Sequence, residues 1–196
     1  MSLLRFLASG APAPATNIED VFSAYTYTGS ASNQTFTTGV DLSTNGGMIW
    51  EKARSTTYAH QLVDSVRGFN KNLDSASTGS QSTDSPANFS VSTTGFTVTG
   101  ATIVNFAGQT HVGWSFRKAA KFFDVVTYTG NGANRTISHN LGAVPGMIMV
   151  KRTDTTGAWM VYHRSLTSNV YYLVLNTTAA EASGATAWNS TTADAS

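Results

Sequence analysis

The sequence predicts an all-β protein, in which an extended N-terminal peptide precedes two homologous antiparallel β-sandwich domains of jelly-roll type, the second incomplete. Three observations support this prediction. Charged residues make up only 12% of the 196 residues, and serine, threonine and 17 glycines are abundant, a composition that suits strands and turns better than helices. Short runs of alternating apolar and polar residues lie between glycine-rich turns. Part of the sequence also occurs twice.

The repeat relates residues 21–53 to residues 122–152. Two tripeptides carry the alignment: Tyr27-Thr28-Gly29 with Tyr128-Thr129-Gly130, and Gly47-Met48-Ile49 with Gly146-Met147-Ile148. The spacing between them differs by two residues, so the gap falls in the intervening turn. We predict three parts: an anchor peptide and spacer at 1–18, a first β-sandwich domain at 19–119, and a truncated second copy at 120–196.

The first part, residues 1–18, differs in composition from the rest of the chain. An apolar cluster precedes a Pro-Ala spacer, which favours extended geometry and holds the cluster away from the first domain. We therefore predict that the cluster docks on a partner subunit; packing against its own first domain is the alternative. The residues assigned to docking are Leu3, Leu4, Phe6, Leu7, Pro12 and Pro14. The apolar run is too short for a signal peptide.

The first domain is expected to hold about seven short strands, as in antiparallel sandwiches. They are predicted at residues 25–28, 34–37, 48–52, 60–64, 89–91, 95–98 and 111–116. Residues 67–69 are predicted as a turn and residues 74–88 as a loop rich in serine, threonine and glycine. Residues 117–121 are predicted to be a solvated linker, with binding to an acidic partner as the alternative.

The second domain is expected to start at Phe122 and to repeat the same plan, with later strands at 159–163 and 171–176. Nothing after residue 176 corresponds to residues 89–116, which carry the last three strands of the first domain. A sandwich without those strands would have an open apolar face and unpaired edges. We therefore expect either that the natural chain continues beyond Ser196 or that a neighbouring subunit supplies the missing strands.

No pattern in the sequence indicates catalysis, metal binding or a cofactor, and we expect none of these. The chain has no cysteine, and its histidines lack the spacing of metal ligands: His60, His111, His139 and His163. No nucleophile-presenting turn surrounds Ser55 or Ser65, although His60 and Asp64 lie nearby in sequence. Nothing selects two of the 11 acidic residues as a glycosidase pair.

The tryptophans separate into three core candidates and one surface candidate. Trp50, Trp114 and Trp159 are interpreted as core residues, with Trp114 pointing inward between apolar neighbours. Trp188 lies in a polar context and is the candidate for stacking on a glycan. A net charge of +1 without a basic stripe gives no reason to expect a nucleic-acid partner, and no apolar run is long enough to span a membrane.

The combination of the YTG and GMI motifs with a VYHRSL segment and a THVGWSFRKA strand resembles tandem domains of unknown function in virion proteins of tailed bacteriophages. Such domains occur in tail-fibre-like proteins, particularly of marine and cyanobacterial phages. The residues that carry the resemblance are Tyr128-Thr129-Gly130, Gly146-Met147-Ile148, Lys151-Arg152, Tyr162-His163-Arg164-Ser165-Leu166 and residues 111–119. The resemblance implies a structural role and transfers no catalytic residue to this chain.

We therefore expect a structural virion protein, most simply a tail fibre or fibre-like appendage assembled in the cytoplasm of a host bacterium. Its N-terminus would dock on other tail, baseplate or neck proteins, and its distal parts would serve host attachment. The resemblance to fibres implies a homo-oligomer, with a trimer as the expected state. The alternatives are a carbohydrate-binding module that recognises a host surface glycan, and a decoration protein of the capsid or a head fibre.

Overall fold

The computed structural model describes residues 16–195, and these residues are almost entirely β or irregular in structure. We call residues 16–117 the first half and residues 118–195 the second half. The first half contains α1 (Ile18–Val21), β1 (Phe22–Thr28), β2 (Gln34–Thr37), β3 (Gly47–Ala53), β4 (Gln61–Asp64), β5 (Gly68–Leu73), β6 (Ser82–Thr83), β7 (Phe89–Val91), β8 (Gly95–Val98) and β9 (Thr110–Arg117). The second half contains β10 (Met147–Val150), β11 (Met160–His163), β12 (Tyr171–Val174) and β13 (Ala182–Ser183).

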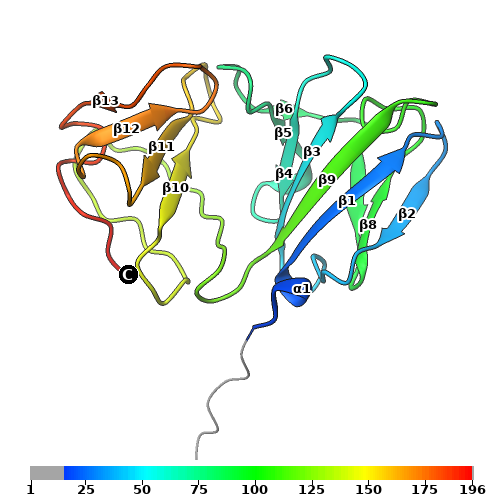
Figure 1. Cartoon of the computed structure of the whole chain (residues 1–196), viewed down its shortest axis with the longest axis horizontal. Helices are drawn as coiled ribbons and strands as arrows, with labels where there is room; N and C mark the ends of the chain where they lie inside the picture. The colour runs from blue at the N-terminus through cyan, green and yellow to red at the C-terminus, as the bar shows by residue number, and fades with distance from the viewer. Residues whose placement is uncertain (1–15, 196) are drawn as a thin grey trace, which may run out of the picture.

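The first half is built from two antiparallel sheets. The larger has the strand order β1-β9-β3-β4-β5-β6, and the smaller has the order β2-β8-β7 (Figure 1). Apolar side chains of both sheets form one buried cluster, which joins Ile49 and Val63 of the larger sheet to Phe96 and Val98 of the smaller one. This burial of aliphatic and aromatic area stabilises the pairing of the two sheets.

Strand β9 occupies the centre of the larger sheet, between β1 and β3. Its buried side consists of His111, Gly113 and Ser115, whereas Trp114 is only half-buried on the opposite face. Gly113 faces the ring of Phe96, and a Cβ atom there would lie 3.1 Å from Cζ of Phe96. The prediction that Trp114 points into the core is therefore wrong, because the inward positions of this strand need small or paired polar residues.

The second half repeats part of the first in order and register. Its sheet, β10-β11-β12-β13, corresponds to β3-β4-β5-β6. The residue numbers of the β3–β4 and β10–β11 pairs differ by 99 throughout: Met48↔Asp64, Ile49↔Val63, Trp50↔Leu62 and Glu51↔Gln61 against Met147↔His163, Ile148↔Tyr162, Met149↔Val161 and Val150↔Met160. Those of the β5–β6 and β12–β13 pairs differ by 100: Lys71↔Thr83 and Asn72↔Ser82 against Tyr171↔Ser183 and Tyr172↔Ala182.

The expected second copies of β1 and β2 do not form strands. Residues 124–146 carry no strand, and in Figure 1 this yellow-green stretch runs as a loop until β10. In the first half β1 pairs with β9, and β2 pairs with β8. The described second half contains no counterpart of β8 or β9. An extended segment without a partner cannot satisfy its backbone groups in a ladder, so it stays irregular.

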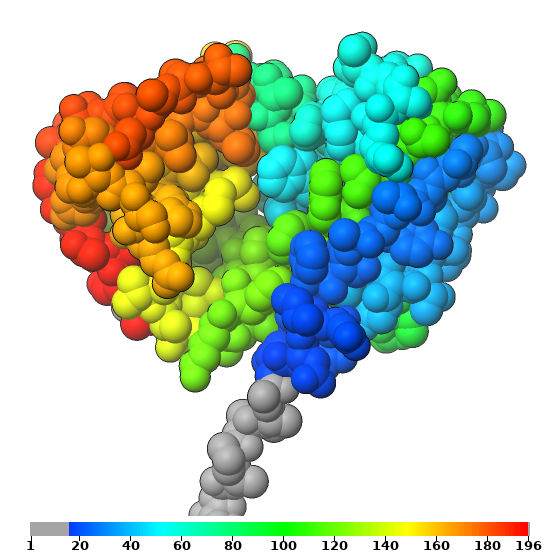
Figure 2. Space-filling view, viewed as in Figure 1, coloured from blue at the N-terminus to red at the C-terminus, as the bar shows by residue number. Residues whose placement is uncertain are grey.

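The two halves contact each other through a second buried cluster. It combines Met48, Leu62 and Leu73 of the larger sheet with Trp159 of the second half, which is only 5% exposed. The indole N–H of Trp159 also donates to the backbone carbonyl of Asp74 at 2.9 Å. The space-filling view shows the two halves as adjoining lobes (Figure 2). The prediction of Trp159 as a core residue is confirmed.

Other expectations differ in detail from the structure. Residues 67–69, predicted as a turn, include the start of β5, and the predicted loop at 74–88 contains β6. The helix α1 was not expected, although it has only four residues. The all-β class is confirmed as three antiparallel sheets within residues 16–195; the domain boundaries at 18/19 and 119/120 stay predictions.

Candidate functional site

The N-terminal docking residues cannot be placed by the structure. Leu3, Leu4, Phe6, Leu7, Pro12 and Pro14 all lie outside the described residues 16–195. A different feature of the described chain deserves a functional interpretation: the edge of the second sheet at β10, together with the irregular residues 123–129 that correspond to β1. We call this feature the open edge.

The open edge is defined by comparison with the first half. Strand β3 pairs with β4 on one side and with β9 on the other. Its counterpart β10 pairs with β11, and no second strand of the described chain lies along its other side. Half of the backbone N–H and C=O groups of β10 therefore lack a ladder partner, which is the usual basis for pairing with another strand.

Equivalent tyrosines show how exposed the open edge is. Tyr27 is 8% exposed, stacks on His111 of β9 with ring centroids 5.0 Å apart, and donates from its hydroxyl to the carbonyl of Val104 at 2.8 Å. Tyr128, its counterpart, is 50% exposed, with the guanidinium of Arg135 5.8 Å from its ring centroid. The same side chain is thus a core residue where β9 is present and a surface residue where no such strand exists.

Methionines at the start of β3 and β10 show the same contrast. Met48 lies opposite Phe116 of β9, belongs to the second cluster, and is 7% exposed. Met147 begins β10 and is 50% exposed. Val126 and Val144 of the second half are exposed as well.

Glycines of the repeat provide a third comparison. A Cβ atom on Gly47 would overlap the backbone carbonyl oxygen of Phe116 in β9, so only glycine fits there. The counterpart Gly146 has room for a side chain, because its nearest neighbours are atoms of the flexible Arg164 side chain at 3.5 Å and beyond. A Cβ on Gly29 would likewise overlap the carbonyl of Phe106, whereas one on Gly130 would meet no atom within 4 Å.

Strand β3 carries a buried carboxylate, Glu51, at a position where β10 carries an apolar residue. Nδ1 of His111 lies 2.7 Å from Oε1 of Glu51, and both side chains are fully buried. Burial raises the pKa of Glu51, although the hydrogen bond from His111 and the charge of Lys52 oppose the rise. Burial and the charge of Glu51 raise the pKa of Tyr27. At the open edge Val150 stands where Glu51 would be, so this charge pair has no counterpart.

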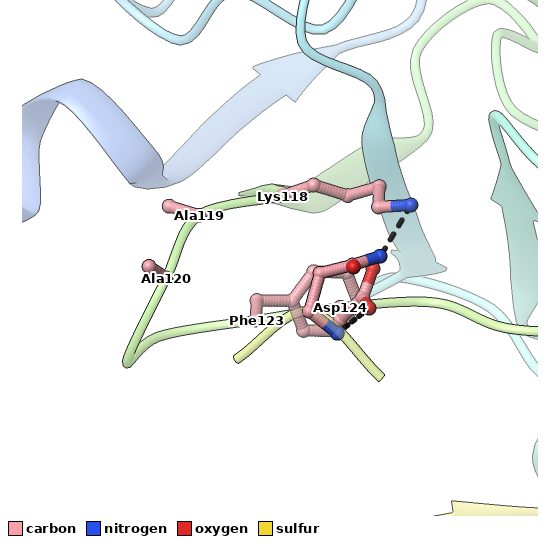
Figure 3. A pocket seen from close by; sticks show the side chains of 6 residues that line it. Lys118, Ala119, Ala120, Phe123 and Asp124 are labelled. Carbon is pink, nitrogen blue, oxygen red and sulfur yellow. Dashed lines mark hydrogen bonds and ion pairs between the residues drawn. The ribbon is translucent and has the colours of Figure 1, made fainter. Parts of the chain in front are cut away.

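The linker between the halves encloses a small hollow of about 210 Å³ (Figure 3). Nζ of Lys118 lies 2.9 Å from Oδ1 of Asp124, whose other oxygen accepts from the backbone N–H of Asn140 at 2.8 Å. Burial acts to raise the pKa of Asp124, but the hydrogen bonds from Lys118 and Asn140 outweigh it and lower the pKa. The predicted solvated linker is therefore a structured turn, and its hollow is lined by groups that already have partners.

A second, polar hollow of about 450 Å³ is lined by residues of the second half alone. Its lining includes Tyr162, Arg164 and Asn169. The ring of Trp188, the predicted glycan-stacking residue, meets the ring of Tyr162 edge-on with centroids 5.9 Å apart. Trp188 is half-buried, and within the described residues its indole N–H has no hydrogen-bond partner. The structure thus places Trp188 beside the hollow rather than isolated on the surface.

The remaining residues that were considered as catalytic candidates each bind a different partner and do not bind one another. His60 accepts a hydrogen bond from the indole of Trp50 at 3.0 Å. Asp64 binds the guanidinium of Arg67 at 2.6 Å. Ser55 donates to the side-chain carbonyl of Gln109 at 2.7 Å. Residues 16–195 contain no group of histidine and acidic side chains arranged to hold a metal ion.

Sequence reasoning missed two features of this region. The buried pair of Glu51 and His111 has no recognisable spacing, since the residues are 60 positions apart. The importance of Gly130 and Gly146 could have been noticed, because both match glycines of the first copy. Glycine in a strand or turn often marks a position where another backbone approaches closely, as it does at Gly29 and Gly47 of the first copy.

Comparison with known proteins identifies a family for this chain but no function. The family of a domain of unknown function (DUF7483) matches residues 17–196. No curated protein and no solved structure matches the chain. Among the described residues, none of the helices has the length and hydrophobicity needed to cross a membrane.

Proposed function

The chain belongs to this DUF7483 family, and we propose that it is a structural protein of a phage virion, a tail fibre or fibre-like appendage. Its N-terminus docks on a tail, baseplate or neck protein, and its distal parts serve attachment to the host. It acts by assembly rather than by catalysis. The observation that carries the proposal is the open edge: a four-stranded ladder repeated in register, with its apolar side chains exposed where β9 covers them in the first half.

The use of the buried polar groups supports a structural role. Glu51 and His111 pair with each other, and Asp64 and Arg67 form a buried ion pair. Each pair joins neighbouring strands or closes a turn, and neither lines one of the two hollows. Buried pairs of this kind can fix the register of neighbouring strands, although Nε2 of His111 has no hydrogen-bond partner within the described residues.

The finer fold assignment is part of the same proposal. We propose that each half is one jelly-roll-like β-sandwich unit, complete in the first half and lacking its last three strands in the second. The resemblance of the tripeptides at 128–130 and 146–148 to tandem domains of tail-fibre-like virion proteins supports this assignment. Homotrimerisation is the expected state of such a fibre.

Deletion of residues 1–16 tests the proposed docking. The shortened protein should fold and stay soluble but be absent from purified phage particles, because the apolar anchor is lost. A full-length variant with serine at Leu3, Leu4, Phe6 and Leu7 is the matched control for chain length and should also be absent. Normal incorporation of both proteins would contradict the proposal, and immunogold labelling on heads rather than tails would favour a head fibre or capsid decoration.

Glycan binding is a second candidate function, favoured by the aromatic pair beside the polar hollow. Tyr162 and Trp188 offer ring surface, and Arg164, Asn169 and Thr167 offer hydrogen-bonding groups. Sugar recognition uses this combination of stacking and polar contacts. A glycan array with the wild type and Trp188→Ala tests it: hits must disappear in that variant and persist in Tyr25→Ala, a matched change of an exposed aromatic residue on β1.

A further inference from the structure

We propose that Asn131 is a site of spontaneous deamidation, at which the backbone nitrogen of Gly132 displaces the side-chain amide and leaves isoaspartate or aspartate. The modification needs no enzyme and no partner protein, and it does not depend on the proposed function. The dipeptide Asn-Gly occurs at two places in the chain, at residues 45–46 and at residues 131–132. The surroundings of the two dipeptides differ, and they assign the reaction to the second one.

The reaction is an intramolecular acyl transfer. The backbone nitrogen of the residue after asparagine loses its proton, attacks Cγ and expels the side-chain nitrogen as ammonia, so that a cyclic succinimide forms. Water then opens the ring at one or the other carbonyl, which gives aspartate or isoaspartate with a new carboxylate. Glycine favours the closure, because it has no Cβ atom to obstruct the attacking nitrogen or to restrict rotation of the backbone.

The first Asn-Gly dipeptide is fixed by its neighbours. Nδ2 of Asn45 donates to Oδ2 of Asp41 at 3.1 Å, so the nitrogen that would leave is hydrogen-bonded. The carbonyl of Gly46 accepts from the backbone N–H of Lys118 at 3.0 Å, and a Cβ atom on Gly46 would lie only 2.6 Å from Oγ of Ser65. Since ring closure requires the backbone of the dipeptide to rotate, these contacts oppose it.

The second dipeptide lies in the irregular stretch that precedes β10. Asn131 and Gly132 are both exposed, and a Cβ atom on Gly132 would meet no atom within 4 Å beyond its chain neighbours. Residues 127–138 form no backbone-to-backbone hydrogen bond with any residue in the range 16–195. Rotation of the backbone that brings the nitrogen of Gly132 to Cγ of Asn131 therefore breaks no such bond.

One local hydrogen bond prepares the side chain of Asn131 for attack. Its Oδ1 accepts from the backbone N–H of Ala133 at 3.0 Å. This donor draws electron density from Cγ and faces the oxygen that gains negative charge when the nitrogen attacks, as the donors of an oxyanion hole do. The side chain of Asn45 is instead bound through its nitrogen.

The test incubates the full chain in mildly alkaline buffer and follows Asn45 and Asn131 in the same sample by peptide mapping with mass spectrometry. Electron-transfer fragmentation separates isoaspartate from aspartate, and isoelectric focusing detects the added carboxylate in a chain of net charge +1. A sample unfolded in guanidinium chloride controls for sequence, because both sites are Asn-Gly dipeptides. The variants are Gly132→Ala, which obstructs ring closure, and its matched control Gly142→Ala, an exposed glycine with positive φ that does not follow an asparagine.

We expect Asn131 to convert at least about tenfold faster than Asn45 in the folded chain, and the two rates to differ by less than about threefold in the unfolded chain. Gly132→Ala should slow the conversion of Asn131 at least about tenfold with an unchanged circular dichroism spectrum, and Gly142→Ala should keep the wild-type rate.

Equal conversion of the two sites in the folded chain, faster conversion of Asn45, or wild-type conversion of Asn131 in Gly132→Ala would overturn the proposal. The same ratio of rates in the folded and unfolded chains would also overturn it, because the surroundings would then have no effect. The comparison between the two sites uses the unmodified chain, so it decides the proposal even where Gly132→Ala folds poorly.

Discussion

Gly47 and Gly146 occupy the same register position in the two halves, yet only Gly47 faces the carbonyl oxygen of a neighbouring strand, that of Phe116. This contrast reflects the main difference between the two halves. One sequence motif is used twice, once with β9 beside it and once without. Because the surroundings differ, the same substitution should have a large effect on stability at Gly47 and a small one at Gly146.

Gly47→Ala should lower the free energy of unfolding by about 2–4 kcal/mol, because the new Cβ forces β3 and β9 apart at a position with φ of +157°. Gly146→Ala should change it by less than about 0.5 kcal/mol. Urea denaturation monitored by circular dichroism measures both. Equal destabilisation by the two substitutions would mean that Gly146 is already crowded and that the open edge is closed.

Trp159→Ala should destabilise the protein by about 3–5 kcal/mol, since it removes the largest side chain that the second half contributes to the cluster between the halves. Trp159→Phe should cost less, about 1–2 kcal/mol, because the ring still fills the cluster while the hydrogen bond to Asp74 is lost. Thermal unfolding should show a single transition in the wild type and two in Trp159→Ala. A single unshifted transition in Trp159→Ala would contradict the packing described here.

Glu51 should make the stability of the protein depend on pH. Its pKa in the folded state is raised above the ordinary value of 4.5, so its contribution to stability is fully present below pH 4.5 and is lost as the pH rises through the folded-state pKa. The free energy of unfolding of the wild type should therefore fall, relative to Glu51→Gln, by up to about 1.4 kcal/mol per pH unit above 4.5.

Urea denaturation at several pH values between 4 and 8 measures this difference. Glu19→Gln, a change of an exposed carboxylate on α1, is the matched control and should keep the pH dependence of the wild type. A constant difference between wild type and Glu51→Gln over this range would show that Glu51 has the same pKa in the folded and unfolded states.

Asp124→Ala should cost about 2 kcal/mol, because the buried carboxylate accepts from Lys118 and from the backbone N–H of Asn140. The pKa of Asp124 is lowered, so its contribution is present above pH 3.8 and is lost as the pH falls through the folded-state value. Arg152→Met, which removes an exposed ion pair with Asp154, is the control and should change stability by less than about 0.5 kcal/mol. Equal effects of the two substitutions in urea denaturation would contradict a structured linker.

The parts of the fold that depend on local pattern could be predicted from the sequence. Strands β2, β7 and β8 have the predicted bounds, because short alternating runs lie between clear turn signals there. The repeated motif also located β10 and β11. These elements need little information beyond alternation and turn residues, which the sequence contains.

The parts that depend on a distant partner could not be predicted. Residues 123–129 match β1 in sequence but form no strand, because strand formation at β1 depends on β9 some 90 residues later. Trp114 was assigned to the wrong face, because both faces of β9 are covered and the apolar side of a strand then no longer identifies the core. The pair of Glu51 and His111 depends on the register of β3 against β9, which no local pattern specifies.

The central claim is that the second half is the same unit as the first with the β9 position empty. Amide hydrogen exchange of the unmodified chain tests it most directly, by comparison of equivalent segments. The account predicts slow exchange throughout residues 48–51, which pair on both sides, and fast exchange of residues 126–129. In the edge strand β10 it predicts protection of only alternate amides in 147–150, those that face β11. Equally slow exchange of every amide in 126–129 and 147–150 in the dilute, isolated protein would contradict the claim.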